Sequence, residues 1–421
     1  MKKKVFLAVC LTVVLFLVSS CMMMSGSGLE SMFGSGSSNQ NTGLTPSVSG
    51  DSVTISRADY EEYQSLKKFS ELAFMYDYAS ENFYREPDTE LMLEYAAEGM
   101  MAGLEDPYSY YYTPEAFEQQ KEDDEGKYVG IGVSILSSDP CVITRVFKGS
   151  PAEKAGVQRG DILYRVEDDL YVTMETLNEA VSIMRGEPNT TVNVTFIRDG
   201  EEITFSILRE EVTINQIESI MLEDGIGYIA MYQFAGEVEL EFEKALNDLI
   251  GEGAKGIIID LRDNPGGWVH QAQYIGDLFM DQGEVCYFVY RDGSEDHRYY
   301  KTYDGKADVK LVVLVNGMSA SSSEILTGAL RDCADATVVG TTTFGKGIVQ
   351  EVIPVGENGA GFQLTIAQYL SPKGNKVHEV GITPDVVIEP SEDDNGSYNF
   401  ADTEKDIQLR KALEVMREKL K

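Results

Sequence analysis

The amino-acid sequence predicts a multidomain protein, with an α/β core that follows a separate β-rich module and with helical segments at both ends. The chain has 421 residues, which is too long for one ordinary domain. The continuous apolar runs "GIIIDL" and "LVVLVN" are typical of strands covered on both faces, and hence of an α/β layer. Between about residues 127 and 212, short β-rich runs surround a single amphipathic helix.

The first 55 residues predict export and a tether. Residues 1–20 begin with three lysines and continue with an apolar run that is short for a membrane-spanning helix, which needs about 20 apolar residues. Small residues directly before Cys21 resemble the processing site of bacterial lipoproteins. Ordinary cleavage near Ser20 and an uncleaved anchor are the alternatives. Residues 21–55 are rich in Gly, Ser and Thr, so we expect a flexible linker between the lipid anchor and the folded domains. The protein would then be anchored to a membrane of the cell envelope.

Charge and cysteine content exclude several classes of protein. The formal net charge of −35 argues against binding to nucleic acid or to an anionic membrane face. Cys10 leaves with the signal and Cys21 is the expected lipid site. Cys141, Cys286 and Cys333 remain, and their spacing is not that of metal ligands. We expect three buried small residues there, without a disulfide framework or a metal site.

The segments after residue 55 divide by their hydrophobic patterns. We place the domain boundaries as follows: helical N-terminal segment 56–126, β-rich module 127–212, α/β core 213–390, and C-terminal linker and helix 391–421.

Two corners, at which a predicted strand turns toward a helix, hold candidates for chemistry. The strand at 256–261 runs into "RDNPGG", and the strand at 311–316 runs into "GMSASSSE". A serine at the second corner lies near a helix N-terminus, where N–H groups favour negative charge. Backbone N–H groups of Gly266, Gly267 and Ser322 are candidates to hold an oxyanion. Serines at such corners also cap helices, so this pattern alone does not establish a nucleophile.

A serine nucleophile needs a base, and the sequence offers three histidines and one lysine. His270, His297 and His378 have no distinctive context. Lys346 lies in "TFGKGIVQ", which is aromatic, glycine-rich and apolar, with no acidic residue within four positions. A lysine can replace histidine when burial keeps it neutral near pH 7. An exposed lysine in a glycine turn is the alternative.

The same stretch, "GTTTFGKG", is close to a phosphate-binding loop but departs from it in two ways. Gly347 stands where that loop needs a hydroxyl for Mg²⁺. The loop must also open a helix, whereas residues 348–355 alternate and predict a strand. Nucleotide hydrolysis is therefore not expected.

Several motifs together resemble the C-terminal processing peptidases, also called tail-specific proteases. They are "DLRDNPGG" (260–267), "SASSSEI" (319–325) and "TFGKG" (343–347). The segments "GLEDPYSYYYTPEAFE", "GSPAEKAGVQRGDIL" and "GITPDV" are also similar to that family and follow its order, so the resemblance covers roughly residues 56–421. It implies a crotonase-like α/β protease core with an inserted PDZ domain at 127–212.

The resemblance also implies roles for individual residues. Ser321 matches the family's nucleophile, Lys346 its general base, and Gln350 the glutamine that orients the base. Asp332 matches a position with a supporting role in some members. Ser322 stands where alanine is commoner, which adds a second hydroxyl and leaves open which serine attacks. The family's chemistry needs no metal or other cofactor.

The PDZ resemblance implies recognition of a peptide's free C-terminus. PDZ domains add the peptide as a strand, and their backbone N–H groups meet its carboxylate. The residues expected to bind it are Val129, Gly130, Ile131, Gly132, Val133, Leu177 and Val181. A glycine pair that only marks a β-bulge is the alternative.

We therefore expect an exported, lipid-anchored serine endopeptidase that recognises the apolar C-termini of proteins and assembles at least as a homodimer through its helical ends. The alternative is a PDZ lipoprotein with an inert core, acting as a scaffold or chaperone. The presence of Ser321, Lys346 and Gln350 argues against this alternative.

Overall fold

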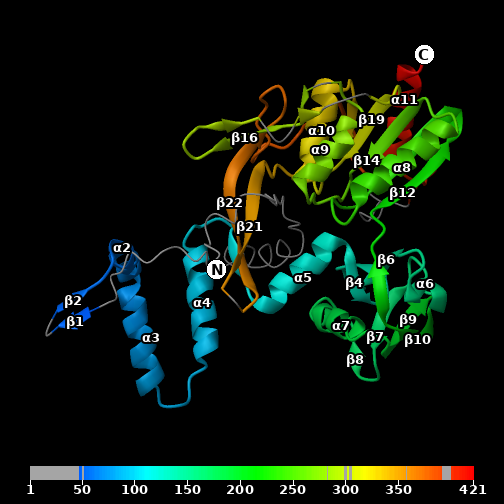
Figure 1. Cartoon of the computed structure of the whole chain (residues 1–421). Helices are drawn as coiled ribbons and strands as arrows, with labels where there is room; N and C mark the ends of the chain where they lie inside the picture. Colours follow the sequence, from blue (N-terminus) through cyan, green and yellow to red (C-terminus); the bar gives the residue numbers. More distant parts are fainter. Residues whose placement is uncertain are drawn as a thin grey trace, which may run out of the picture.

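A computed structural model describes residues 47–49, 52–281, 283–297, 301–302, 306–356, 358–390 and 400–421. The predicted signal, Cys10, Cys21 and most of the predicted linker lie outside the described residues. Figure 1 shows helical arms at the N-terminal end, a β-rich module and an α/β core. Among the described residues, no helix is both long enough and apolar enough to cross a membrane.

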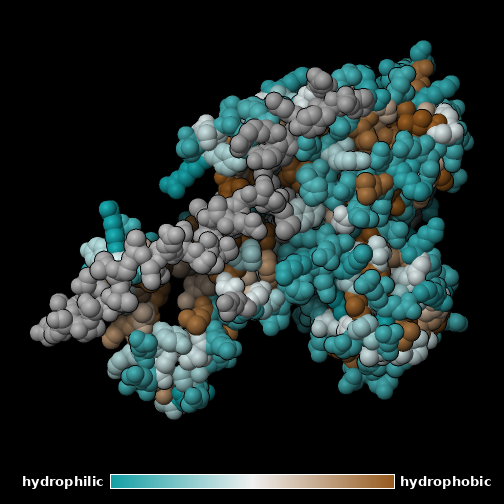
Figure 2. Space-filling model, viewed as in Figure 1, coloured by the Kyte–Doolittle hydropathy of each residue, from teal (hydrophilic) through white to brown (hydrophobic). Residues whose placement is uncertain are grey.

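The N-terminal segment forms helices that bury very little. After a small hairpin of β1 (Ser47–Ser49) and β2 (Ser52–Thr54) come α2 (Arg57–Leu66), a 3-10 turn η2 (Lys67–Phe69), α3 (Ser70–Asn82) and α4 (Thr89–Ala102). Neither α3 nor α4 contains a buried residue. In Figure 1 these helices stand apart from the core, and in Figure 2 hydrophobic residues lie open between the two arms.

A segment after α4 joins these helices to the core. It contains β3 (Tyr110–Tyr112), which pairs antiparallel with β22 (Ala360–Leu370) of the core. Next, α5 (Pro114–Glu125) starts with Thr113 as its N-cap and ends at Gly126 in the left-handed conformation. The chain then enters the β-rich module.

The β-rich module begins and ends with two strands that pair with each other. The chain enters through β4 (Lys127–Gly130) and leaves through β11 (Glu210–Thr213), which is antiparallel to β4. Between them lies a sheet in the order β10-β9-β7-β6-β5, with β8 beside β7. Its strands are β5 (Val133–Leu136), β6 (Val142–Val146), β7 (Ile162–Val166), β8 (Leu170–Tyr171), β9 (Thr191–Arg198) and β10 (Glu201–Leu208). The helices α6 (Pro151–Ala155) and α7 (Leu177–Met184) complete the module around its own hydrophobic core.

The α/β core is built on a six-stranded sheet in the order β12-β13-β14-β19-β20-β23. Its first strand is antiparallel to the second, and the others are parallel. The strands are β12 (Ile217–Leu222), β13 (Ile226–Met231), β14 (Gly256–Asp260), β19 (Lys310–Val315), β20 (Thr337–Gly340) and β23 (Val386–Val387). The structure thus confirms strands at the two places where the apolar runs predicted them, within a residue at each end.

Both faces of this sheet are covered, as the apolar runs predicted. Alternate residues of the central strands pack on one side against α8 (Val238–Gly251), α9 (Val269–Asp277) and α10 (Ser322–Cys333). The residues between them pack on the other side against α11 (Ile407–Lys419). Strands buried on both faces need apolar side chains at every position, which explains the unbroken runs.

A second sheet of the core has the order β17-β16-β22-β21, with β3 beside β22. Its remaining strands are β16 (Tyr287–Tyr290), β17 (Glu295–Asp296) and β21 (Ile348–Val355), and β15 (Gly283–Glu284) pairs separately with β18 (Lys301–Thr302). β21 follows the "TFGKG" turn directly. The predicted strand at 348–355 is confirmed, and this turn therefore lacks the helix that a phosphate-binding loop requires.

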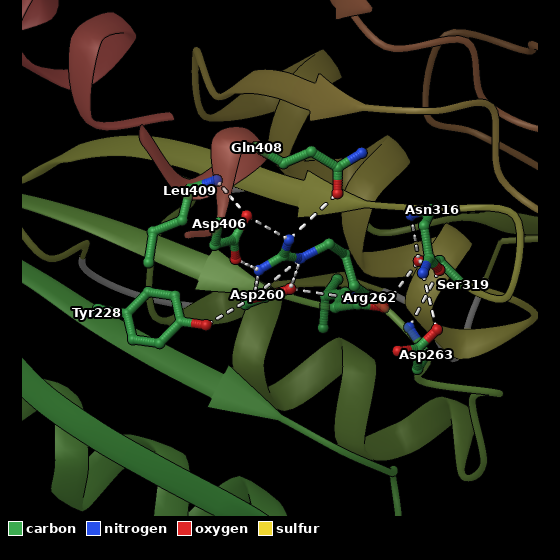
Figure 3. A network of polar contacts seen from close by, with 10 residues as sticks. Tyr228, Asp260, Arg262, Asp263, Asn316, Ser319, Asp406, Gln408 and Leu409 are labelled. Carbon is green, nitrogen blue, oxygen red and sulfur yellow. Dashed lines mark hydrogen bonds and ion pairs between the residues drawn. The ribbon is translucent and has the colours of Figure 1, made fainter. Parts of the chain in front are cut away.

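Helix α11 is fixed to the sheet by a buried polar network (Figure 3). The Arg262 guanidinium lies 2.6 Å from carboxylate oxygens of both Asp260 and Asp406. It also donates to Gln408 at 3.1 Å, and the Tyr228 hydroxyl donates to Asp260 at 2.6 Å. A buried charge is stable only when it is paired and hydrogen-bonded, and this network meets that condition.

Candidate active site

The two corners predicted from the sequence lie against each other. β14 and β19 are parallel neighbours with Asp260 opposite Leu314, so the turns after them leave the sheet side by side. A methyl group on Gly266 would lie 2.7 Å from Cβ of Ser321 and 2.9 Å from the backbone nitrogen of Ser322. The backbone of Gly266 has φ +101°, which side chains rarely adopt. Only glycine allows this approach of one corner to the other.

Ser321 lies at the N-terminus of α10 in a strained backbone conformation. Its φ of 55° and ψ of −118° are unusual for a residue with a side chain. The residue is fully buried. Among the described residues, its Oγ has no hydrogen-bond partner. α/β hydrolases also hold their nucleophile on a strained strand-to-helix turn.

Lys346 lies in the turn between β20 and β21 and is only 2% exposed. Its Nζ is 4.8 Å from the centre of the Tyr108 ring, which comes from the segment between α4 and β3. The next residue must be glycine, because a methyl group on Gly347 would lie 2.2 Å from the backbone nitrogen of His378. The burial of Lys346 excludes the alternative that the sequence left open, an exposed lysine in a glycine turn.

A buried carboxylate joins the serine corner to the lysine turn. Glu324 on α10 accepts hydrogen bonds from the N–H of Ser321 at 3.0 Å and of Lys346 at 2.9 Å, both on Oε2. Its Oε1 accepts from the hydroxyl of Thr343 at 2.5 Å and the N–H of Gly345 at 2.7 Å. Burial raises the pKa of Glu324 above its ordinary value, and these four hydrogen bonds act in the opposite direction.

Tyr369 on β22 makes a second connection between the same two segments. Its hydroxyl lies 3.1 Å from the carbonyl oxygen of Ser321 and 3.0 Å from that of Lys346, so its proton is shared between them. Sequence reasoning did not single out Glu324, Tyr369 or Tyr108. Glu324 lies inside the serine motif and Tyr108 inside "GLEDPYSYYYTPEAFE", but no local pattern assigns either side chain to the lysine.

Gln350 on β21 is fully buried, and its side-chain hydrogen bond goes to Thr365 and not to Lys346. Its side-chain nitrogen donates to Thr365 Oγ1 at 3.2 Å. Its Oε1 is buried and has no hydrogen-bond partner within the described part of the chain. The predicted orientation of Lys346 by Gln350 therefore stays a prediction.

The three expected oxyanion donors differ in the hydrogen bonds that they already make. The Gly266 N–H donates to Asn264 Oδ1 at 2.9 Å, so it is already engaged. The Gly267 N–H donates to no other described residue. The Ser322 hydroxyl donates to the Gly267 carbonyl at 2.7 Å, which leaves Ser321 as the serine whose hydroxyl is unengaged. The backbone of Ser322 remains at the helix N-terminus, beside Gly266.

None of the three histidines has a hydrogen bond to Ser321 within the described residues. The His270 ring stacks obliquely against Trp268, and burial lowers its pKa. His297 lies between Glu284 and Glu295. His378 contacts the lysine turn through its backbone at Gly347.

Two further expectations concern residues near the end of α10. Asp332 accepts hydrogen bonds from the Ser371 hydroxyl at 2.6 Å and the Lys373 N–H at 3.2 Å, so it supports the turn after β22. The expectation that all three remaining cysteines are buried is wrong for Cys333. Cys141 and Cys286 are buried, but Cys333 is exposed at the last turn of the helix. The described residues contain no cluster of His, Cys, Asp and Glu suited to a metal ion.

Comparison with known proteins decides the family. Residues 225–388 match the model of peptidase family S41. The chain is 33% identical over 350 residues to the carboxy-terminal-processing protease of Bartonella bacilliformis. This match covers 81% of this chain and 79% of the relative. It is 32% identical over 389 residues to the carboxy-terminal processing protease CtpA of Bacillus subtilis, with 90% and 82% covered. This chain belongs to the carboxy-terminal processing proteases of family S41.

Other matches agree with this family and with the module boundaries. Residues 128–208 match a PDZ domain, and residues 28–116 match the N-terminal domain of the activating protease CtpB. A solved structure of a putative S41 protease from Bacteroides fragilis, 17% identical, has the same fold with a TM-score of 0.55 over 80% of this chain and 91% of that one. The protein is thus a PDZ-containing serine protease.

Within the PDZ domain of this S41 protease, the expected peptide-binding residues differ in exposure. Ile131 and Leu177 are buried in the domain core, whereas Val133 and Val181 are partly exposed against it. Val129 and Gly130 lie in β4, paired with β11. Gly132 has φ +90°, and a methyl group there would lie 2.2 Å from Ser150 Cβ. Close approach therefore explains this glycine, and the pairing of β5 with β6 also has a register irregularity two residues further on, between Ser134 and Ile135.

Proposed function

We propose that this protease cleaves peptide bonds by a Ser321–Lys346 dyad. The observation that carries the proposal is the convergence of both residues on one oxygen of Glu324, with an unengaged Ser321 hydroxyl beside them. Burial of Lys346 disfavours its charged form, and a neutral amine is what a general base requires. Gln350, the third residue of β21, is the proposed orienting group for this amine.

The proposed reaction proceeds through an acyl-enzyme. Lys346 Nζ takes the hydroxyl proton of Ser321, whose Oγ bonds to the scissile carbonyl carbon. The backbone N–H groups of Gly267 and Ser322 stabilise the resulting oxyanion. The C–N bond then breaks, and the Lys346 ammonium returns the proton to the leaving amine. Water, deprotonated by the same amine, hydrolyses the ester and restores both residues.

We further propose that the PDZ domain captures the free, apolar C-terminus of protein substrates. PDZ domains bind such termini by adding a strand beside an exposed edge, and β5 is at the edge of its sheet. The acidic, exported chain would act in the cell envelope, held by a lipid on Cys21. We infer a crotonase-like fold for the protease core from its mixed sheet with helices on both faces.

We also propose a homodimer formed through the N-terminal arms. Phe74, Met75 and Tyr78 on α3 are 61–68% exposed, and Leu93, Tyr95 and Met100 on α4 are 54–62% exposed. Exposed apolar patches of this extent are typical of interaction sites. Sedimentation of the wild type and of Phe74→Glu and Tyr78→Glu tests this proposal. A monomeric wild type would contradict it.

The experiment for the dyad uses an unfolded reporter protein with an apolar tail. Its cleavage is followed with the wild type, Ser321→Ala and Lys346→Ala, and with the same reporter carrying an amidated C-terminus. We expect both variants to be inactive and amidation to slow the wild type. Normal cleavage by Lys346→Ala would reject the dyad. A wild type that binds the tail but never cleaves would favour the scaffold alternative.

A further inference from the structure

Tyr108 comes from outside the peptidase match yet contacts the proposed base. It lies in the segment between α4 and β3, whereas the S41 match begins at residue 225. Its ring centre is 4.8 Å from Lys346 Nζ. Tyr108 is itself half-buried, and Lys346 is almost completely buried. A partly exposed ring therefore lies directly beside a buried amine.

Hydrogen bonds on both sides fix the position of this tyrosine. Asp106 accepts from the Tyr108 N–H at 3.1 Å and from the Ser109 hydroxyl at 2.6 Å. The Tyr108 carbonyl accepts from the side chain of Gln363 at 2.9 Å. Tyr110–Tyr112 then pair with β22. The ring is thus positioned by the core sheet and does not lie in a loose loop.

The same segment also reaches Gln350. Ser109 Oγ accepts a hydrogen bond from the Thr365 N–H at 2.9 Å. The hydroxyl oxygen of Thr365 accepts from Gln350 Nε2 at 3.2 Å. Two adjacent residues of this segment therefore reach the site. Tyr108 contacts Lys346, and Ser109 contacts Thr365, which in turn holds Gln350.

We propose that Tyr108 is a positioning residue of this protease, whose ring covers the Lys346 amine, keeps water away from it and so maintains it as a neutral base. The inference rests on the proposed role of Lys346 as that base. It means that the N-terminal segment completes the active site of the peptidase module.

The ring has two opposite effects on the balance between the neutral and the charged form of Lys346, and the larger effect decides which form the ring favours. Attraction between the ring face and the ammonium favours the charged form by up to about thirtyfold in the equilibrium. Exclusion of water favours the neutral form and can lower the pKa of a fully buried lysine by as much as about 3–5 units. Removal of the ring should therefore favour the ammonium, because hydration outweighs the lost attraction.

Other titratable groups face this site and stay unchanged in the test. Around the lysine turn they are Glu324 on α10, Tyr369 on β22, His378 in the loop before β23, and Asp106 beside Tyr108 itself. Since these groups are common to all variants, a difference between variants reports the ring.

The test measures kcat/KM against pH for the full-length protease on the unfolded reporter. The variants are Tyr108→Ala, Tyr108→Gln and Tyr108→Phe, with Tyr111→Ala as the matched control. Tyr111 lies three residues further on, in β3, and its neighbours are Glu94, Glu98 and Asn358. Thermal unfolding of each variant is recorded, and Tyr108→Gln, which brings a polar side chain, replaces Tyr108→Ala if the latter fails to fold.

We expect the acidic limb of the profile to move up by about one pH unit or more in Tyr108→Ala and Tyr108→Gln, with activity at pH 7 falling about tenfold. Tyr108→Phe, which keeps the ring, and Tyr111→Ala should retain the wild-type limb. An unchanged limb in Tyr108→Ala or Tyr108→Gln, or a shift to lower pH, would overturn the inference. So would a shift in Tyr108→Phe as large as that in Tyr108→Ala.

Lys346→Ala, assayed in parallel, separates this inference from the proposed function. If Lys346→Ala cleaves normally, the dyad itself fails. If Lys346→Ala is inactive while Tyr108→Ala keeps the wild-type profile, the dyad stands and only the role of Tyr108 is rejected.

Discussion

Ser321 and Lys346 donate their backbone N–H groups to the same atom, Oε2 of Glu324. One residue lies at the start of α10 and the other in the turn before β21. The shared acceptor makes the relative position of the two segments depend on a single buried carboxylate. Tyr369 repeats the connection on the carbonyl side of both residues. The strained backbone of Ser321 is therefore held from both of its peptide groups.

Glu324→Gln tests this connection. The amide keeps one acceptor oxygen but replaces the other with a donor, so two of the four N–H or O–H groups lose their partner. Each unsatisfied buried group costs about 1–3 kcal/mol. We expect kcat to fall at least tenfold and the free energy of unfolding to fall by about 2–6 kcal/mol. The reporter assay and urea unfolding measure both quantities, with Glu379→Gln, an exposed side chain, as the control. Full activity in Glu324→Gln would reject the positioning role.

Gly266→Ala should abolish activity. The added methyl would lie 2.7 Å from Ala320 O and from Ser321 Cβ, at a backbone φ of +101°. Such crowding must displace the serine corner, and overpacking of this kind costs about 1–3 kcal/mol of stability. Gly317→Ala is the matched control, since a methyl there would meet only Thr342 O at 3.8 Å. Cleavage rates and melting temperatures compare the two variants. Equal behaviour would contradict the close approach of the corners.

Asp406→Ala should destabilise the core through α11. The change leaves the Arg262 charge buried with one partner fewer, and it removes the cap that accepts from the Leu409 N–H. Removal of one partner from a buried ion pair costs about 3–5 kcal/mol. Glu414→Gln on the same helix removes only an exposed pair with Lys411 and should leave the stability almost unchanged. Chemical unfolding of both variants measures the difference, and a small effect of Asp406→Ala would contradict the stabilising role of the network in Figure 3.

Asp124→Asn should change how stability depends on pH. Burial, the largest cause, raises the pKa of Asp124 from 3.8 to about 7, and neighbouring Asp123 and Glu125 add to it. The folded state therefore holds this proton more tightly than the unfolded chain does. The resulting stabilisation is full below about pH 4 and is lost as the pH rises through about 7.

Asparagine keeps the acceptor for Gln120 but has no proton to lose. At pH 4 the variant should match the wild type, and at pH 8 it should be more stable by a few kcal/mol, since each pKa unit corresponds to about 1.4 kcal/mol. Denaturant unfolding at both pH values measures this, with Glu115→Gln, an exposed residue of the same helix, as the control. Parallel pH dependences of Asp124→Asn and the wild type would contradict the raised pKa.

Local patterns were sufficient for much of this protein. Unbroken apolar runs predicted the buried strands at 256–261 and 311–316, because a strand covered on both faces needs apolar residues throughout. Alternation at 348–355 predicted the strand that excludes a phosphate-binding loop. The spaced motifs around Ser321 and Lys346 identified the family, which the comparisons confirmed.

The arrangement around the lysine was decided only by the tertiary structure. Glu324, Tyr369 and Tyr108 meet Lys346 from three segments that are distant in sequence, and no periodicity encodes such contacts. The same holds for the Gly266 N–H, which Asn264 engages, and for the exposure of Cys333. Residue types and spacing determine which strands and turns can form. Which side chains share a buried carboxylate, hydroxyl or ring depends on how the two sheets and the N-terminal segment pack together.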